Sequence, residues 1–169
     1  MIAAALLATV AAPAAPVVFV CEHGTVKSVI AAEIFNKRAA ERKLAFRAVS
    51  RGVAPDAGIP EGVAAKLAGD GYDVAGFTPK ALDKGDVAGA PHVVAIGVDP
   101  PLLAGAKRVS RWTDIPPAST RYAEARDAMA TRIEALLDTL AGVPAAGLPA
   151  PKSSGYAEAA EGLRVYYEV

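Results

Sequence analysis

The single cysteine of this 169-residue chain, Cys21, is the side chain whose surroundings indicate the most specific chemistry. It follows the apolar run 17–20, and a helical pattern begins at Lys27 after a short loop. Backbone N–H groups and the helix dipole at such a helix start favour a bound anion, and the same field favours a thiolate. A thiolate beside an anion-binding loop indicates attack on an oxyanion ester, or capture of an oxyanion such as arsenate.

The loop composition weighs against two other interpretations. A cysteine at the end of a buried strand is often an inert, small hydrophobic residue, but Gly24, Lys27 and Ser28 favour the reactive interpretation. The residues from Gly24 to Ser28 also resemble the end of a nucleotide-binding loop, G-x-x-x-x-G-K-[ST]. That motif requires Gly where Val26 stands and another Gly five residues earlier. Both are missing, so nucleoside triphosphate binding is excluded.

The elements that position this loop alternate between strands and helices. Strand-like runs occur at 17–20, 46–50, 92–98 and 107–112, and helical patterns at 27–43, 60–68 and 119–140. Asp83 or Asp86 is expected to cap a further short helix. This alternation predicts an α/β fold, a three-layer sandwich around a four-stranded parallel sheet. Ligands of open parallel sheets bind at the carboxyl ends of strands, where Cys21 falls.

Composition limits the classes of partner. Lys plus Arg and Asp plus Glu number 18 each, so no net positive field favours nucleic acid. The 53% of apolar and 21% of charged residues exclude a disordered chain. The 2 His and 1 Cys cannot complete a four-ligand zinc site or form an internal disulfide. We expect no metal and no organic cofactor.

The two ends of the chain differ from its middle. Residues 1–15 carry no charged side chain, and their apolar run of about eleven residues is too short for an integral membrane span. The run and the Ala-Pro-Ala at 12–14 predict a signal peptide over 1–15, hence a periplasmic or secreted protein. No Lys or Arg precedes the run, so a cytoplasmic protein with an unstructured extension stays open. We expect the domain over 16–142 and a mobile Pro/Ala/Gly-rich tail over 143–169.

Val-Val-Phe-Val-Cys-x5-Lys-Ser followed by a helix resembles the low-molecular-weight protein tyrosine phosphatases and the arsenate reductases that share their fold. Their signature is a strand, Cys-x5-Arg-Ser and a helix. Ser50-Arg51-Gly52 stands where the family has Ser-Ala-Gly, and the Asp-x-x-x-Ala-Pro-x-Val-Val-x-Ile run to Ile96 matches the third strand. Residues 112–116 fall where the family carries an Asp-Pro general acid. The resemblance covers roughly residues 17–140.

The resemblance implies a phosphate monoester or related oxyanion as substrate. Cys21 would be the nucleophile that forms a cysteinyl phosphate, and Ser28 would donate a hydrogen bond to its thiolate. Asp114 would protonate the leaving oxygen and later activate water. The loop would hold the phosphoryl oxygens through its backbone amides. Its phosphate-binding residues would be Glu22, His23, Gly24, Thr25, Val26, Lys27 and Ser28.

The loop departs from the family pattern at three positions. Lys27 replaces the Arg and cannot offer two parallel N–H bonds, a loss on the order of 2–3 kcal/mol in the transition state. Arg51, after the second strand, is a candidate auxiliary guanidinium. His23 and Gly24 stand where the family has Gly and Asn; Gly24 still accepts a positive φ. We expect an outward-facing His23, with a substrate contact as the alternative, and a structural role for His92.

Three functions remain open from the sequence. The first is a Cys-dependent phosphomonoesterase that requires Cys21 and Asp114. The second is an arsenate reductase that requires Cys21 and an external thiol, because one cysteine cannot support an internal thiol cascade. The third is a weak or non-catalytic anion-binding module, which the substitution at Lys27 favours.

Overall fold

The computed structural model describes residues 15–142, 154–158 and 164–168. The chain divides into two compact units, Met1–Leu137 and Asp138–Val169. The predicted signal peptide at 1–15 lies almost entirely outside the described residues. In the part of the chain that is described, no helix is long and apolar enough to cross a membrane.

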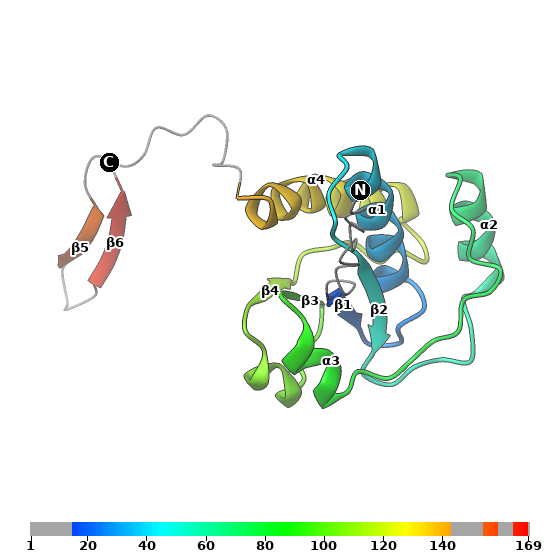
Figure 1. Cartoon of the computed structure of the whole chain (residues 1–169), viewed down its shortest axis with the longest axis horizontal. Coiled ribbons are helices and arrows are strands. Elements are labelled where there is room, and N and C mark those ends of the chain that lie inside the picture. Colours follow the sequence, from blue (N-terminus) through cyan, green and yellow to red (C-terminus); the bar gives the residue numbers. More distant parts are fainter. Residues whose placement is uncertain (1–14, 143–153, 159–163, 169) are drawn as a thin grey trace, which may run out of the picture. The chain divides into compact units, whose positions relative to one another are not determined.

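The first unit is built on a four-stranded sheet with the order β2-β1-β3-β4 (Figure 1). All three neighbouring pairs are parallel, which confirms the predicted sheet. The strands are β1 (Val17–Cys21), β2 (Ala48–Gly52), β3 (Val93–Ile96) and β4 (Val109–Trp112). β2 pairs with one edge of β1, and β3 pairs with the other edge. The carboxyl end of β1 therefore lies where the strand order reverses, which is the usual ligand site of such sheets.

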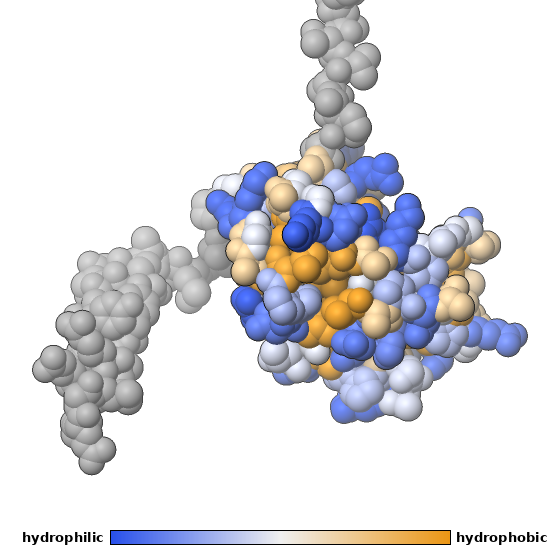
Figure 2. All heavy atoms as spheres, turned by 90° about the horizontal axis from the view of Figure 1, so that it is seen from below, coloured by the Kyte–Doolittle hydropathy of each residue, from blue (hydrophilic) through white to orange (hydrophobic). Residues whose placement is uncertain are grey.

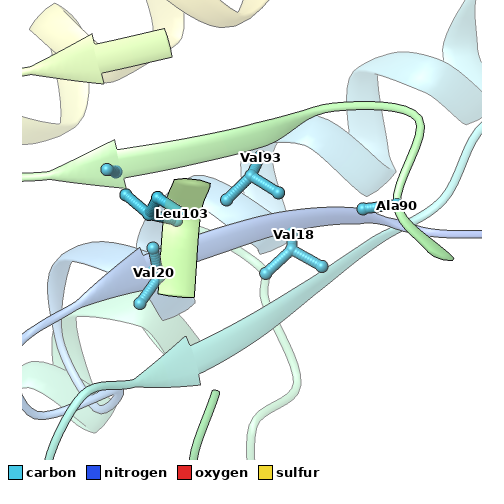
Figure 3. Packing of buried hydrophobic residues seen from close by; sticks show 6 residues of the cluster. Val18, Val20, Ala90, Val93 and Leu103 are labelled. Carbon is cyan, nitrogen blue, oxygen red and sulfur yellow. The ribbon is translucent and has the colours of Figure 1, made fainter. Parts of the chain in front are cut away.

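Helices cover the sheet on both faces, which confirms the three-layer prediction. Phe19 of β1 packs against Phe35 with ring centroids 5.8 Å apart. Val18 and Val20 point the opposite way, as alternate residues of a strand must, and cluster with Ala90 and Leu103 (Figure 3). The helices are α1 (Lys27–Glu41), α2 (Glu61–Gly69), α3 (Lys84–Gly89), the 3-10 helix η1 (Pro101–Gly105) and α4 (Tyr122–Leu140).

The burial of each strand explains its composition. β1 is apolar throughout because every residue of a central strand is buried between helical layers. β2 lies at the edge and alternates buried and half-buried residues, so polar Ser50 and Arg51 are accommodated there. His92 is buried just before β3, with Nε2 2.8 Å from the Ser110 hydroxyl, so its predicted structural role is confirmed.

The segment predicted to be a Pro/Ala/Gly-rich tail, 143–169, contains two strands that the sequence analysis did not predict. Strands β5 (Ser154–Glu158) and β6 (Arg164–Glu168) form an antiparallel pair in the second unit. The Pro, Ala and Gly content around them obscured the signal, although Tyr, Val and Tyr-Tyr favour strands. Residues 143–153, 159–163 and 169 lie outside the described residues.

Candidate active site

The loop between β1 and α1 closes tightly against the end of β2. Gly24 has a φ of +65°, and a Cβ atom on it would lie 2.7 Å from the backbone nitrogen of Gly52. A Cβ atom on Gly52 would in turn lie 2.9 Å from the nitrogen of Gly24. These neighbours are backbone atoms that cannot move aside, so both positions require glycine. The loop owes its shape to this close approach of two chain segments.

The carbonyl groups at the start of the loop are held from outside by the segment that follows β2. The backbone N–H groups of Val53 and Ala54 donate to the carbonyl oxygens of Cys21 and Glu22 at 3.0 and 2.8 Å. The N–H group of Asp56 donates to the carbonyl oxygen of His23 at 3.1 Å. These three bonds fix the orientation of the peptide units next to the cysteine.

The N–H groups of the same loop are free to bind an anion. Within the described part of the chain, none of the backbone N–H groups of residues 22–27 donates a hydrogen bond. α1 also begins without a side-chain cap at Val26 and without an acidic residue in its first turn. Unpaired donors at a helix N-terminus form an anion-binding site. The loop that was predicted to bind phosphate therefore surrounds Cys21 with free N–H donors. We call the N–H groups of residues 22–27 the cradle.

Two buried hydroxyl groups connect the cysteine to the rest of the loop. The Cys21 sulfur lies 3.0 Å from Ser28 Oγ, as predicted, and Ser50 Oγ lies 2.8 Å from Ser28 Oγ. Ser50 Oγ also lies 3.1 Å from the Gly24 carbonyl oxygen. A hydroxyl group donates one proton at a time. In the thiol state Cys21 can donate to Ser28 Oγ, while the single hydroxyl proton of Ser50 goes either to Ser28 Oγ or to the Gly24 carbonyl oxygen.

In the thiolate state the hydrogen bond between Cys21 and Ser28 runs in the opposite direction. Ser28 then donates to the sulfur, and Ser50 can donate either to Ser28 or to the Gly24 carbonyl group. A charge-assisted hydrogen bond of this kind stabilises the thiolate. Ser50 was not among the predicted site residues. Its signal in the sequence is a serine within an otherwise apolar strand pattern.

The cradle opens into a cavity of about 290 Å³ at the carboxyl end of the sheet. Its far wall is mainly apolar. Viewed from the side toward which the β2 arrowhead points, the first unit shows a central apolar patch rimmed by hydrophilic residues (Figure 2). The residues that line the cavity are Cys21, Glu22, His23, Val26, Lys27, Ile96, Gly97, Val98, Pro117, Ala118 and Ser119.

Lys27 lies in this cavity wall, as the loop pattern predicted. Its ammonium group donates to the carbonyl oxygen of Ile115 at 3.2 Å. An ammonium group has three donors, so two remain for an anion in the cradle. A Cβ atom built on the facing Gly97 would lie 3.7 Å from Lys27 Nζ. Gly97 thus leaves space beside the amine.

The structure does not bring Asp114 into the cavity, contrary to the expectation from the resemblance. Its carboxylate accepts a hydrogen bond from Arg132 of α4 at 2.6 Å, and its side chain is 73% exposed. The Arg132 hydrogen bond lowers the pKa of Asp114 below its ordinary value. The lowered pKa disfavours the protonated form that a general acid needs. The neighbouring cavity wall comes from residues 117–119 instead.

Arg51 is likewise held away from the anion. Its Nε donates to one carboxylate oxygen of Asp86 at 2.6 Å and its Nη2 to the other at 2.8 Å. Both side chains are largely buried, and neither lines the cavity. The bidentate pair joins the edge strand β2 to α3, so the guanidinium group of Arg51, a candidate auxiliary group from the sequence, is bonded to Asp86 and does not reach the cavity.

His23 occupies the mouth of the cavity with an acidic partner. Its Nδ1 lies 3.3 Å from one carboxylate oxygen of Asp56. Thr25 donates its hydroxyl proton to the other oxygen at 3.4 Å. The His23 side chain is 60% exposed, as an outward-facing residue would be, yet it also lines the cavity. Asp56, which positions it, was not among the predicted residues.

Residues 16–99 match the family model described as low molecular weight phosphotyrosine protein phosphatase. No curated protein sequence matches the chain. Among solved structures, YfkJ from Bacillus subtilis is 20% identical with a TM-score of 0.66, over 78% of this chain and 98% of that one.

Two further structures come from the two classes of protein that the sequence resembles, the arsenate reductases and the tyrosine phosphatases. A thioredoxin-dependent arsenate reductase from Corynebacterium glutamicum is 22% identical, with a TM-score of 0.65 over 80% of this chain and 66% of that one. A low molecular weight protein tyrosine phosphatase from T. tengcongensis is 22% identical, with a TM-score of 0.60 over 73% of this chain and 98% of that one. These likenesses confirm the predicted fold.

Proposed function

We propose that this chain, which belongs to the family of low-molecular-weight phosphotyrosine protein phosphatases and their arsenate reductase relatives, hydrolyses phosphate monoesters through a cysteinyl-phosphate intermediate. The observation that carries the proposal is the unpaired set of N–H groups of residues 22–27 around Cys21. A phosphate ester placed there meets donors for its oxygens and a sulfur nucleophile on its phosphorus.

The first chemical step transfers the phosphoryl group to sulfur. The Cys21 thiolate, stabilised by the Ser28 hydroxyl, attacks phosphorus, and the bond from phosphorus to the leaving oxygen breaks. The loop amides hold the three non-bridging oxygens and stabilise the charge that develops on them. Lys27 adds a positive charge at the same oxygens. The leaving oxygen takes a proton.

The second step returns the enzyme to its starting state. Water attacks phosphorus, loses a proton and forms inorganic phosphate, while the bond from phosphorus to sulfur breaks. The sulfur leaves as a thiolate, which Ser28 again stabilises. The same N–H groups serve both steps because the phosphoryl oxygens stay in the cradle throughout.

The cavity favours an aromatic leaving group. Beyond the cradle its wall is formed by Ile96, Val98, Pro117 and Ala118, which offer apolar surface to a ring. The cavity of about 290 Å³ is open at its mouth, so a ring can lie in it while the rest of a larger substrate stays outside. Phosphotyrosine and simple aryl phosphates fit this description.

Arsenate reduction is the second candidate, and the position of Asp114 favours it. Capture of arsenate requires the thiolate and the cradle but no general acid at the Asp114 position. Cys21 would form a sulfur–arsenic bond. An external thiol would then attack the Cys21 sulfur, releasing arsenite and leaving a mixed disulfide, which a second thiol would reduce.

One comparison separates the candidates. The full chain is assayed under reducing conditions with an aryl phosphate between pH 4.5 and 8, and with arsenate plus a small thiol, beside Cys21→Ser. The proposal expects aryl phosphate turnover that vanishes in Cys21→Ser, while phosphate or vanadate binding persists. Turnover of arsenate alone would favour the reductase. Binding without either reaction would indicate an anion-binding module.

We also propose that residues 1–15 direct export, so that the enzyme acts in the periplasm or outside the cell. The uncharged apolar run and the Ala-Pro-Ala at 12–14 support this. Fusing residues 1–20 to a reporter that is active only after export tests it. Export of the fusion is expected, and retention of the reporter in the cytoplasm would refute it.

A further inference from the structure

The proposed hydrolysis needs a group that protonates the leaving oxygen, and the site as described so far does not identify it. Asp114 is ionised and bonded to Arg132, outside the cavity wall. Besides Lys27, whose ammonium group donates to the Ile115 carbonyl oxygen, the described residues that line the cavity and carry an ionisable side chain are Cys21, Glu22 and His23. Cys21 is the nucleophile, so the choice falls between the other two.

Their surroundings distinguish these two candidates. The described part of the chain shows no partner that orients the Glu22 side chain. His23 is oriented twice, through the Asp56 carboxylate 3.3 Å from its Nδ1 and through the backbone bond from Asp56 N to its own carbonyl oxygen. Thr25 holds the second oxygen of the same carboxylate. With Nδ1 at Asp56, the opposite ring nitrogen, Nε2, is the one left for a substrate.

We propose that His23 is the general acid and base of this site and that Asp56 positions it. This rests on the phosphatase function proposed above. In the first step Nε2–H gives its proton to the leaving oxygen as the oxygen–phosphorus bond breaks. In the second step neutral Nε2 takes a proton from the attacking water as the oxygen–phosphorus bond forms. The imidazole ring thus returns to its protonated state once per turnover.

The charges around His23 suit this cycle. The Asp56 carboxylate lies 3.3 Å from Nδ1, and Glu22 precedes His23 in the loop. Lys27 lines the same cavity, and a bound phosphoryl group would carry the charge opposite to its own. An Asp–His pair of this kind holds the ring in the tautomer that leaves Nε2 free.

A series of aryl phosphates with graded leaving groups tests the role in the full-length protein. A general acid matters little for 4-nitrophenyl phosphate, whose leaving group departs readily, and strongly for phenyl phosphate. For His23→Gln we expect kcat/KM to fall about hundredfold on phenyl phosphate and about threefold or less on 4-nitrophenyl phosphate. For Asp56→Asn we expect about a tenfold fall on phenyl phosphate. Glu22→Gln should keep the wild-type dependence on the leaving group.

The pH profile gives a second readout that a merely structural role would not move. Wild-type kcat/KM for phenyl phosphate should show a limb that requires one protonated group of the enzyme, and His23→Gln should lose this limb. Vanadate binding and the melting temperature of each variant report whether the loop is intact.

The outcomes separate this inference from the proposed function. If wild type turns over both esters and His23→Gln lowers both rates equally, or neither, the acid role is refuted while the phosphatase stands. A steeper leaving-group dependence in Glu22→Gln instead would assign the acid to Glu22 and also overturn the inference. If wild type hydrolyses no aryl phosphate at all, both proposals are refuted.

Discussion

Replacing Lys27 by Arg is expected to raise phosphatase activity. The ammonium group of Lys27 donates one of its three N–H bonds to the Ile115 carbonyl oxygen at 3.2 Å. Its remaining donors diverge, so only one of them can point well at a given pair of phosphoryl oxygens. A guanidinium group offers two parallel N–H bonds to the same pair.

The gain is about one charge-assisted hydrogen bond in the transition state. Such a bond contributes about 1.5–3 kcal/mol, which corresponds to roughly a tenfold to hundredfold increase in rate. The space for the larger head group exists because Gly97 has no side chain, and a Cβ atom there would lie 3.7 Å from Nζ.

The assay is kcat/KM for an aryl phosphate, with inorganic phosphate inhibition measured beside it. Lys27→Gln, which removes the charge, should lower kcat/KM by at least about tenfold. Lys37→Arg, on the exposed face of the same helix, is the matched control and should behave as wild type. If Lys27→Arg does not exceed wild type while Lys27→Gln falls, the loop needs only a point charge and the bidentate reasoning is refuted.

Three further predictions follow from the same structure. Gly52→Ala should destabilise the chain by about 1–3 kcal/mol and reduce phosphate binding, because the new Cβ would meet Gly24 backbone atoms at 2.9 Å. Chemical denaturation measures the loss of stability. Gly62→Ala, whose Cβ would meet nothing within 4 Å, is the control. Asp114→Asn should leave kcat and its pH profile unchanged, since the carboxylate is bonded to Arg132 and does not line the cavity. Loss of activity would restore Asp114 as the acid. Burial lowers the pKa of His92 in the folded state, so the unfolded chain binds more protons and stability should fall as pH drops below about 6.5. His92→Gln should flatten that fall between urea titrations at pH 7.5 and 5.5, and an unchanged slope would contradict the assignment.

The parts of the site that the sequence could predict are those that one continuous segment builds. Residues 17–28 contain, in order, the apolar strand, the cysteine, the loop and the start of the helix. Because these parts are consecutive, the local sequence pattern is enough to predict a thiolate next to free N–H groups. The strand alternation likewise fixes a parallel sheet, because each strand here is a short, strongly apolar run between helical patterns. The second strand is displaced by two residues from its expected range, since an edge strand has a weaker apolar pattern.

The errors concern side chains whose partners lie far along the chain. Asp114 is bonded to Arg132, 18 residues later, and Arg51 to Asp86, 35 residues later. No local pattern indicates either pair, because both depend on how α4 and α3 pack against the sheet. Motif position alone placed both residues in the site, and tertiary ion pairs removed them.

The same consideration determines which group can serve as the acid in this chain. A carboxylate bonded to a guanidinium group is held in its charged form, whereas an imidazole bonded to a carboxylate keeps a second nitrogen that both donates and accepts protons. Arg132 thus removes Asp114 from proton transfer, and Asp56 prepares His23 for it. His23 lies within the predicted loop, but its function depends on Asp56, 33 residues away, which the backbone bonds after β2 bring alongside it. The nucleophile of this fold is therefore encoded locally, while its proton donor depends on which charged partner each side chain meets after folding.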